Sequence, residues 1–245
     1  MQVVIDIGNT RTKIGLFDGN NFVRTEFVTD ETQVADVISN LRPSSIILSS
    51  VGNDMDELRE ILKEFCPVLK FKNTTPVPIE LDYESRDTLG VDRLAGVVGA
   101  FTLFPGHACL VIDAGTCITY DVIDADGVYR GGAISPGTAM RFKAMHKFTA
   151  RLPMKELSEN LSLPGKDTGN CMNSGVAYGT AFEMEGMIDY FEKQYRPLKT
   201  ILCGGDAIFF ESKIKRYIFA NSDLVLVGLN SILQYNEFDQ KVYNH

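Results

Sequence analysis

The sequence predicts an α/β protein built from two similar halves that face each other across a cleft. Residues 3–71 place three strands ahead of a helix, a strand, a second helix and a last strand. The strand–turn–strand unit that opens this series returns in the middle of the chain, where Asp113 stands 107 residues after Asp6. A repeat at about the spacing of one domain indicates an internal duplication.

The first half shows its elements as apolar runs separated by turn residues. The runs expected to form strands are residues 3–7, 14–17, 22–28, 46–48 and 68–71. Helical spacing of apolar residues predicts helices over residues 34–41 and 55–65. Residues 73–90 lack periodicity and contain two prolines, which favours a long loop, and a helix is expected over residues 92–104.

The second half opens with the same unit. Residues 110–116 give an apolar strand and a glycine turn, residues 118–124 give a second strand, and residues 125–127 form an Asp-Gly turn. The stretches VVIDIGNTRTKIGLFDGN and LVIDAGTCITYDVIDADG share these features in the same order. We therefore expect an N-terminal lobe over residues 1–106 and a C-terminal lobe over residues 107–245.

The composition excludes several classes of protein. Hydrophobic residues make up 44% of the chain, which excludes a disordered protein. The formal charge of −8 and the pI near 5.0 leave no broad basic surface, so neither nucleic acid nor a membrane is expected as a partner. Residues 94–112 carry no Asp, Glu, Lys or Arg, but Pro105 and Gly106 interrupt them, which favours a buried helix and strand over a membrane span.

The cysteines and the N-terminus predict a cytoplasmic protein. The five cysteines show no C-x-x-C spacing, and with only three histidines a zinc site is not expected. Such cysteines are typical of buried, reduced thiols in the cytoplasm. No Lys or Arg precedes Asp6, so the first residues lack the basic region of a signal peptide.

The two strand–turn units carry groups that suit a nucleotide phosphate. Asp6 and Asp113 supply carboxylates for a cation, and the adjacent glycines let backbone N–H groups approach an oxyanion. Thr10 and Thr116 add hydroxyl donors, and Lys13 can place a positive charge beside a terminal phosphate. The alternative is that the two aspartates only cap hairpins. No P-loop, dinucleotide-binding or protein-kinase motif competes with the first interpretation.

A phosphotransferase also needs a base for the attacking hydroxyl, and Asp92 is the candidate. It begins the helix expected over residues 92–104, where the helix dipole favours its negative charge. The neighbouring Arg93 can pair with Asp92 or hold a substrate carboxylate through two hydrogen bonds. The alternative is an ordinary N-terminal aspartate beside a solvated arginine.

Six motifs occur in the order in which one enzyme family has them. They are residues 6–13 (DIGNTRTK), 90–93 (GVDR), 113–116 (DAGT), 131–137 (GGAISPG), 150–153 (ARLP) and 204–206 (GGD). On these motifs the chain, from its first residues to Gly228, resembles type III pantothenate kinase, a family of the sugar kinase, Hsp70 and actin superfamily. The resemblance implies actin-like, ribonuclease H-like halves, each with the order β-β-β-α-β-α-β.

The resemblance also implies an activity, the ATP-dependent phosphorylation of pantothenate at its primary hydroxyl, which begins coenzyme A synthesis. The residues that would hold the ATP phosphates are Asp6, Ile7, Gly8, Asn9, Thr10, Arg11, Thr12 and Lys13. Asp6 would also bind Mg²⁺, Thr116 would contact ATP, and Asp113 would bind the monovalent cation of this family, K⁺ or NH₄⁺. Asp92 would be the catalytic base. The residues that would line the pantothenate pocket are Tyr83, Gly90, Val91, Asp92 and Arg93.

Two features of the second half extend the resemblance. Residues 166–175 look like the family's N-T-x-x-A-x-x-S-G stretch, which makes Thr168 a substrate contact, although Asp167 and Cys171 replace the usual Asn and Ala. The family is dimeric, with the pantothenate pocket completed by the partner. The apolar residues between 176 and 195 suit a homodimer contact, and they equally suit ordinary core.

Two other functions stay open at this point. One is a non-catalytic regulator on the same scaffold, which loss of either motif aspartate would favour. The other is a kinase of the same superfamily that acts on a different small alcohol, in which case the loop over residues 73–90 should differ.

Overall fold

The computed structural model describes residues 1–8, 12–29, 31–50 and 55–243. The chain groups into two compact units, each with its own core. The first unit contains Met1–Pro105, Gly127–Tyr129 and Asp223–His245, and the second contains Gly106–Asp126 and Arg130–Ser222.

The first unit begins with a five-stranded sheet. Its elements are β1 (Gln2–Ile7), β2 (Thr12–Asp18), β3 (Asn21–Val28), α1 (Glu31–Leu41), β4 (Ser45–Ser50), α2 (Asp56–Lys63) and β5 (Val68–Lys70). The strands lie in the order β3-β2-β1-β4-β5, with β1 antiparallel to β2 and parallel to β4. The order of elements predicted from the sequence is confirmed.

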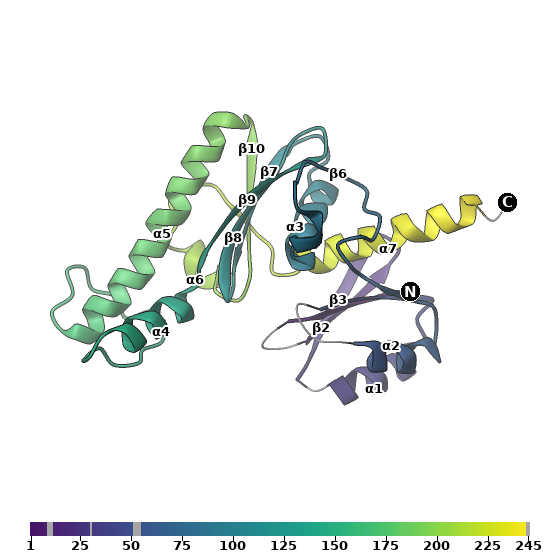
Figure 1. Cartoon of the computed structure of the whole chain (residues 1–245), viewed down its shortest axis with the longest axis horizontal. Coiled ribbons are helices and arrows are strands. Elements are labelled where there is room, and N and C mark those ends of the chain that lie inside the picture. The colour runs from purple at the N-terminus through teal and green to yellow at the C-terminus, as the bar shows by residue number, and fades with distance from the viewer. Residues whose placement is uncertain (9–11, 30, 51–54, 244–245) are drawn as a thin grey trace. The chain divides into compact units, whose positions relative to one another are not determined.

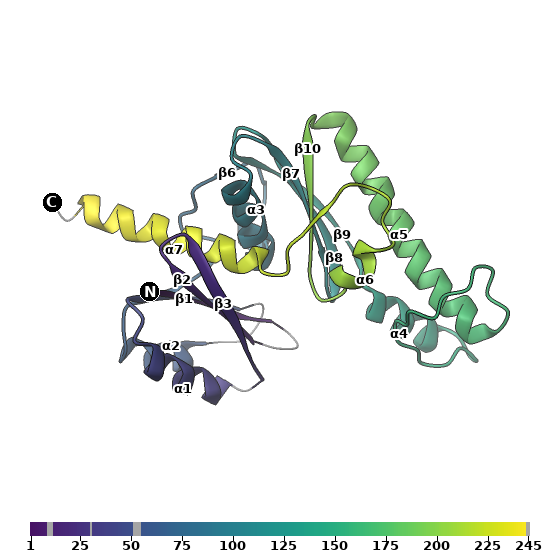
Figure 2. The same ribbon diagram turned by 180° about the vertical axis from the view of Figure 1, so that it is seen from behind.

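Helices cover both faces of this sheet, which explains why β1 and β4 read as nearly continuous apolar runs. Val3, Ile5 and Ile7 of β1 pack with Val34 and Ile38 of α1 in one buried cluster. In Figures 1 and 2, α1 and α2 lie on one face of the sheet, and α7 (Leu224–Tyr243) lies on the other.

Helix α7 packs against α3 (Val91–Leu103) through two glycines. A Cβ built on Gly99 would lie 2.3 Å from the carbonyl oxygen of Leu224, and one on Gly228 would lie 1.8 Å from that of Ala95. Only glycine allows the two backbones to approach so closely. This contact places Asp223–His245 with the first unit, whereas the division expected from the sequence left these residues in the C-terminal lobe.

The expected loop over residues 73–90 contains only two short elements, β6 (Glu80–Leu81) and the 3₁₀ turn η1 (Arg86–Thr88). Its two ends are tied together, because Arg86 donates to the carbonyl oxygen of Asn73 at 2.7 Å and Asn73 donates to that of Asp87 at 2.6 Å. Polar groups of the loop itself therefore connect its start to its end.

The second unit repeats the topology of the first. Its elements are β7 (Ala108–Ala114), β8 (Cys117–Ile123), β9 (Val128–Pro136), α4 (Thr138–Phe148), α5 (Thr168–Gln194), β10 (Leu198–Cys203), α6 (Ala207–Glu211) and β11 (Phe219–Ala220). The first two residues of β9, Val128 and Tyr129, group with the first unit, and the rest of the strand groups with the second. The order β9-β8-β7-β10-β11 corresponds strand for strand to β3-β2-β1-β4-β5. The predicted duplication is confirmed, and α4 is the helix added between the third strand and the following helix.

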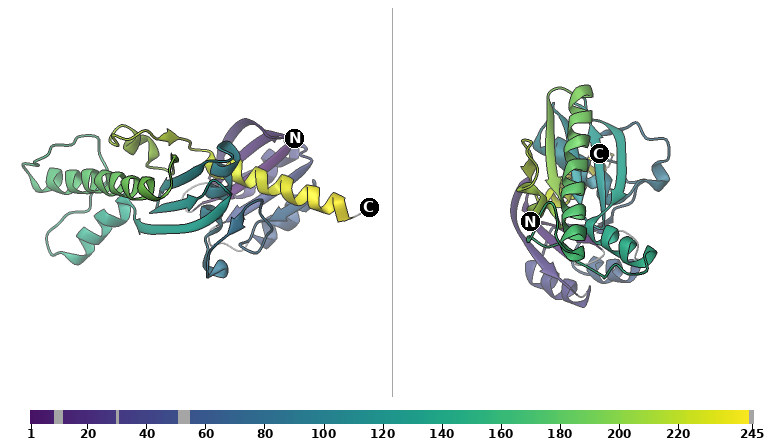
Figure 3. Two further views of the ribbon diagram at one scale, coloured as in Figure 1. Left: turned by 90° about the horizontal axis from the view of Figure 1, so that it is seen from above. Right: turned by 90° about the vertical axis from the view of Figure 1, so that its left-hand side faces the viewer.

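Helix α5 is the long helix of the second unit, with 27 residues. Figure 3 shows α4 beside its N-terminal end. The apolar residues Ala181, Met184 and Ile188 of α5 are buried in the core cluster that also contains β7 and β8, so part of its apolar face is ordinary core. Within the described part of the chain, no helix combines the length and the apolar character that crossing a bilayer requires.

Candidate active site

The hairpin of β1 and β2 positions the first candidate carboxylate. Asp6 is the penultimate residue of β1, half-buried, and it lies directly opposite Lys13 of β2. Burial raises the pKa of Asp6 to about 6. The positive charge of Lys13 opposes this rise and the negative charge of Asp92 adds to it. A half-buried carboxylate held near a second carboxylate favours a cation beside it.

The other residues expected to hold ATP phosphates fall into three groups. Gly8 is exposed at the end of β1, whereas the side chains of Ile7 and Thr12 are buried. The remaining three expected residues, Asn9, Thr10 and Arg11, lie outside the described residues. Any contribution of Ile7 to a phosphate would therefore come from its backbone.

Asp92 lies in the first turn of α3, two residues after the N-cap residue Gly90. The Oδ1 atom of Asp92 accepts a hydrogen bond from the backbone N–H of Arg93 at 2.8 Å. A Cβ on Gly90 would lie 2.6 Å from the same oxygen, so glycine leaves space for the carboxylate at the start of the helix. The GVDR motif thus places a carboxylate at the positive end of a helix, near Asp6.

Arg93 belongs to an aromatic cluster that also contains Tyr83 and Tyr129. An Nη atom of Arg93 donates to the hydroxyl of Tyr129 at 3.0 Å, and its guanidinium lies 5.9 Å from the centre of the Tyr83 ring. The rings of Tyr83 and Tyr129 stack with their centres 5.6 Å apart. The structure therefore brings the expected substrate residues Tyr83 and Arg93 together.

Sequence reasoning missed Tyr129, which contacts both of those residues. Tyr129 lies on β9, far from both along the chain, and it follows an unremarkable Asp-Gly turn. The only signal was its place two residues before the Gly-Gly pair of the GGAISPG motif.

The turn between β7 and β8 positions Asp113, the counterpart of Asp6. Asp113 is again the penultimate residue of its strand, half-buried, and it lies opposite Thr119 of β8. Two glycines pack around it. A Cβ on Gly204, whose φ is +94°, would lie 2.4 Å from Asp113 Oδ1, and one on Gly115 would lie 3.3 Å from it. Backbone groups therefore come close to this carboxylate on two sides.

Three further residues fix the same turn, and sequence reasoning assigned no individual role to any of them. Gly137 donates its N–H to the carbonyl oxygen of Thr116 at 3.2 Å, and Asp206 donates its N–H to that of Ala114 at 2.9 Å. The hydroxyl of Thr138 donates to Asp206 Oδ2 at 2.6 Å. Gly137 and Asp206 come from the GGAISPG and GGD motifs, and Thr138 directly follows the first of these, so segments far apart in the sequence converge on one turn. The side chain of Thr116 is exposed there.

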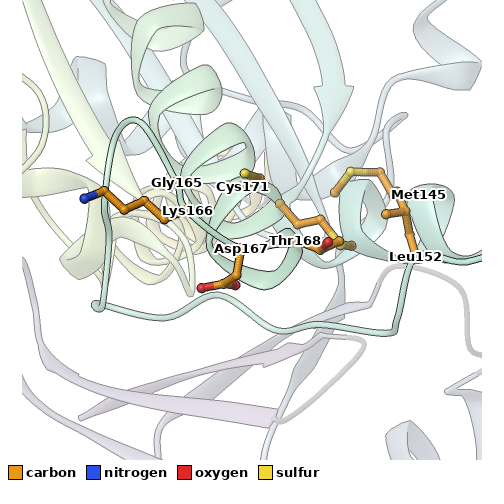
Figure 4. Close-up of a pocket in the computed structure, with 8 residues that line it drawn as sticks. Met145, Leu152, Gly165, Lys166, Asp167, Thr168 and Cys171 are labelled. Carbon is orange, nitrogen blue, oxygen red and sulfur yellow. The ribbon is translucent and has the colours of Figure 1, made fainter.

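Thr168 is the first residue of α5, exposed, and lines a cavity of about 500 Å³. The residues around the cavity are Met145, Leu152, Gly165, Lys166, Asp167, Thr168, Cys171 and Met172. Figure 4 shows Thr168 and Asp167 beside each other among the residues that line the cavity.

Asp167 is the N-cap residue of α5, which explains why a carboxylate is tolerated here. One of its oxygens accepts from the backbone N–H of Asn170 at 2.9 Å, and the other accepts from the side-chain amide of Asn170 at 2.6 Å. These hydrogen bonds lower the pKa of Asp167. Because the carboxylate is engaged with the helix end, the substitution of Asn by Asp at this position has a structural role.

The comparisons with known proteins decide the family. A sequence model of type III pantothenate kinase matches residues 2–190, more than half of the chain. A type III pantothenate kinase from Cytophaga hutchinsonii is 41% identical over 236 residues, which cover 96% of this chain and 100% of that protein. The chain belongs to the type III pantothenate kinase family.

Two solved structures confirm the fold expected for this family. A Campylobacter jejuni protein assigned to the Baf family of transcriptional activators has a TM-score of 0.63 and 20% identity, covering 96% of this chain and 98% of that one. A glucokinase from an Antarctic psychrotroph has a TM-score of 0.56 and 13% identity, with the same coverage. At these identities the similarity shows the duplicated actin-like architecture and nothing about activity.

A type III pantothenate kinase works on ATP with a divalent metal, and the surroundings of Asp6 fit such an ion. Among the described residues, no three or more His, Cys, Asp or Glu side chains group so as to hold a metal. Mg²⁺ needs no such group, because it binds through one or two protein carboxylates while water and phosphate oxygens complete its shell. The half-buried Asp6 carboxylate, with Asp92 nearby, matches that requirement.

Proposed function

We propose that this type III pantothenate kinase uses Asp92 as the base that takes the proton from the primary hydroxyl of pantothenate as the hydroxyl attacks ATP. The observation that supports this role is the proximity of Asp92 to Asp6 within the first unit, close enough for the charge of Asp92 to raise the pKa of Asp6. Phosphoryl transfer requires a base, a phosphate-binding turn and neutralisation of charge close together.

The β1–β2 hairpin would hold the ATP phosphates. Asp6 would bind Mg²⁺, which neutralises phosphate charge when it is bound. Lys13, directly across the hairpin, places a positive charge on the same side of the two strands as Asp6. Residues 6–13 would supply the remaining contacts to the phosphates.

The substrate pocket would lie next to the base. Gly90, Val91 and Arg93 adjoin Asp92 in the chain, and Tyr83 lies against Arg93. Pantothenate carries a carboxylate, which a guanidinium binds with two parallel hydrogen bonds. Arg93 would hold that carboxylate, while Asp92 accepts the proton of the hydroxyl.

The β7–β8 turn would bind the monovalent cation, K⁺ or NH₄⁺, through Asp113, and Thr116 would contact ATP. Two observations support this assignment: the half-buried carboxylate of Asp113 and the close approach of backbone groups around it. A large monovalent cation is coordinated well by carboxylate and carbonyl oxygens.

A cytoplasmic homodimer is the expected working form, with Thr168 as a substrate contact. Helix α5 has an exposed face that supports this proposal. Phe182 and Tyr190 are 59% and 57% exposed, and a Cβ added to Gly175, Gly179 or Gly186 would meet no atom within 4 Å. An apolar face with small residues suits close contact with a second helix.

The decisive experiment is an activity assay with the purified protein. Pantothenate, ATP, Mg²⁺ and K⁺ should yield 4′-phosphopantothenate, and Asp92→Asn should lower kcat by about 10²–10⁴-fold, the usual contribution of a general base. Asp87→Asn, in the exposed turn η1, is the control and should keep wild-type kcat.

Two results would contradict the proposal. Wild-type kcat in Asp92→Asn, with an unchanged circular dichroism spectrum, would remove Asp92 from its role. If a substrate panel showed phosphorylation of a different alcohol and none of pantothenate, the protein would still be a kinase, but pantothenate would not be its substrate. Sedimentation velocity would test the homodimer.

A further inference from the structure

Tyr129 is a buried tyrosine whose hydroxyl and ring both contact residues expected to bind the substrate. Its side chain is fully buried, at 0% exposure. The hydroxyl accepts a hydrogen bond from Arg93 at 3.0 Å, and the ring stacks on Tyr83. A buried phenol that is matched to a guanidinium in this way fixes the plane in which the guanidinium lies.

The backbone of Tyr129 fixes the other side of the same cluster. Leu81 of β6 pairs with Tyr129 in a short parallel ladder, and the carbonyl oxygen of Tyr129 accepts from the N–H of Asp82 at 3.0 Å. Tyr83 follows Asp82 directly in the chain, so the backbone of Tyr129 positions Tyr83 while the ring of Tyr129 stacks on it. All of these residues belong to the first unit.

We propose that Tyr129 is a positioning residue for substrate recognition, which orients the guanidinium of Arg93 toward the carboxylate of the acid substrate. The inference rests on the proposed function, in which Arg93 binds that carboxylate. Tyr129 does not touch the substrate. It acts through Arg93, and through Tyr83 of the loop over residues 73–90.

The hydroxyl of Tyr129 matters because bidentate binding of a carboxylate depends on the orientation of the planar guanidinium. An arginine side chain has several rotatable bonds, and one ordered hydrogen bond removes much of that freedom before the substrate arrives. Losing the bond should therefore weaken binding of the acid and leave the transfer step nearly unchanged.

Tyr129→Phe tests this inference, since it removes one oxygen and keeps the ring that stacks on Tyr83. The KM for pantothenate should rise about 10-fold, as expected when one hydrogen bond to a charged group is lost. Both kcat and the KM for ATP should stay within about twofold of the wild type. A KM does not depend on how much of the enzyme has folded, so incomplete folding cannot imitate this result.

A double-mutant cycle separates positioning from a general structural role. In an Arg93→Met background, Tyr129→Phe should change the KM for pantothenate by less than about twofold, because its effect passes through Arg93. Tyr120→Phe is the matched control. It also loses the hydroxyl of a fully buried tyrosine, one that donates to Glu183 in the second unit, and it should keep the wild-type KM.

Three outcomes would overturn the inference: an unchanged KM for pantothenate, an equal rise in the KM for ATP, or the full 10-fold effect in the Arg93→Met background. If Tyr129→Phe cannot be purified, Arg93→Lys replaces it. Lysine lacks the planar group that Tyr129 orients, so a wild-type KM in that variant would also overturn the inference. A wild-type protein that fails to phosphorylate pantothenate would instead overturn the proposed function.

Discussion

The two halves place an aspartate at the same point and surround it differently. Asp6 and Asp113 are each the penultimate residue of the first strand in sheets of the same strand order. Across the hairpin, Asp6 lies opposite Lys13, a cation, whereas Asp113 lies opposite Thr119, a neutral hydroxyl. The duplicated topology fixes where the carboxylate stands, and the neighbours decide what it can bind.

The surroundings also differ in the backbone. Gly204 brings backbone close to Asp113 from the end of β10. At the equivalent place in the first unit, β4 is followed by residues 51–54, which lie outside the described residues. Among the described residues, the first half therefore sets a charged side chain opposite its aspartate, and the second half brings backbone at Gly204 close to its own.

The largest effect should come from exchanging each aspartate for asparagine. Asp6→Asn should lower kcat by roughly 10²-fold at saturating K⁺, because charge neutralisation by a divalent ion contributes several kcal/mol. Asp113→Asn should instead raise the K⁺ concentration for half-maximal activity about 10-fold, with kcat recovered at high K⁺. Titrations with K⁺ and Mg²⁺ at constant ionic strength measure both quantities. If the activity of both variants depended on the Mg²⁺ concentration and that of neither on K⁺, the two aspartates would not bind different cations.

A smaller effect is expected from the two adjacent glycines in the second half. Gly204→Ala should lower the free energy of unfolding by about 1–3 kcal/mol, because φ is +94° and the added Cβ would lie 2.5 Å from the carbonyl oxygen of Ala114. Gly205→Ala is the matched control. A Cβ there meets no atom within 4 Å, so the change should stay below about 1 kcal/mol. Urea denaturation of the two variants measures the difference, and equal losses would contradict the close approach at Gly204.

The smallest effect is a pH-dependent change in stability at α4. This helix lies between β9 and α5, and the described residues between β3 and α1 form no counterpart. Arg141 of α4 pairs with Glu183 of α5 at 2.5 Å, and the buried Tyr120 donates to the same carboxylate at 2.8 Å. Burial alone would raise the pKa of Glu183, but hydrogen bonds from Arg141, Tyr120 and Ser135 outweigh it and lower the pKa. The folded state therefore binds the proton less readily than the unfolded state.

The pH dependence of stability follows from that sign. The stabilisation is present above the ordinary glutamate pKa of 4.5 and is lost as the pH falls through the lower folded value. Between pH 7 and pH 3 the wild-type protein should lose more stability than Glu183→Gln, and the loss in Tyr120→Phe should lie between these two. Urea midpoints at the two pH values measure this loss. A Glu183→Gln variant with the same loss as the wild type would exclude the carboxylate as its source.

The fold was predictable because both halves carry strong local patterns. Short apolar runs, each ended by a turn residue, gave the strands of residues 1–71 and revealed the repeat. The position of residues 223–245 was not predictable. No helix was predicted there, and the glycine contacts between α7 and α3 are what assign α7 to the first unit.

The candidate site divides in the same way. The sequence by itself determined which residue types could do the chemistry, because carboxylates at strand ends and beside glycines are visible as motifs. The tertiary structure alone decided that Tyr129 joins Tyr83 and Arg93, and that Thr138 and Asp206 fix the turn after Asp113. Such contacts join residues distant in the chain, and they depend on strand pairing and helix packing that no local pattern records.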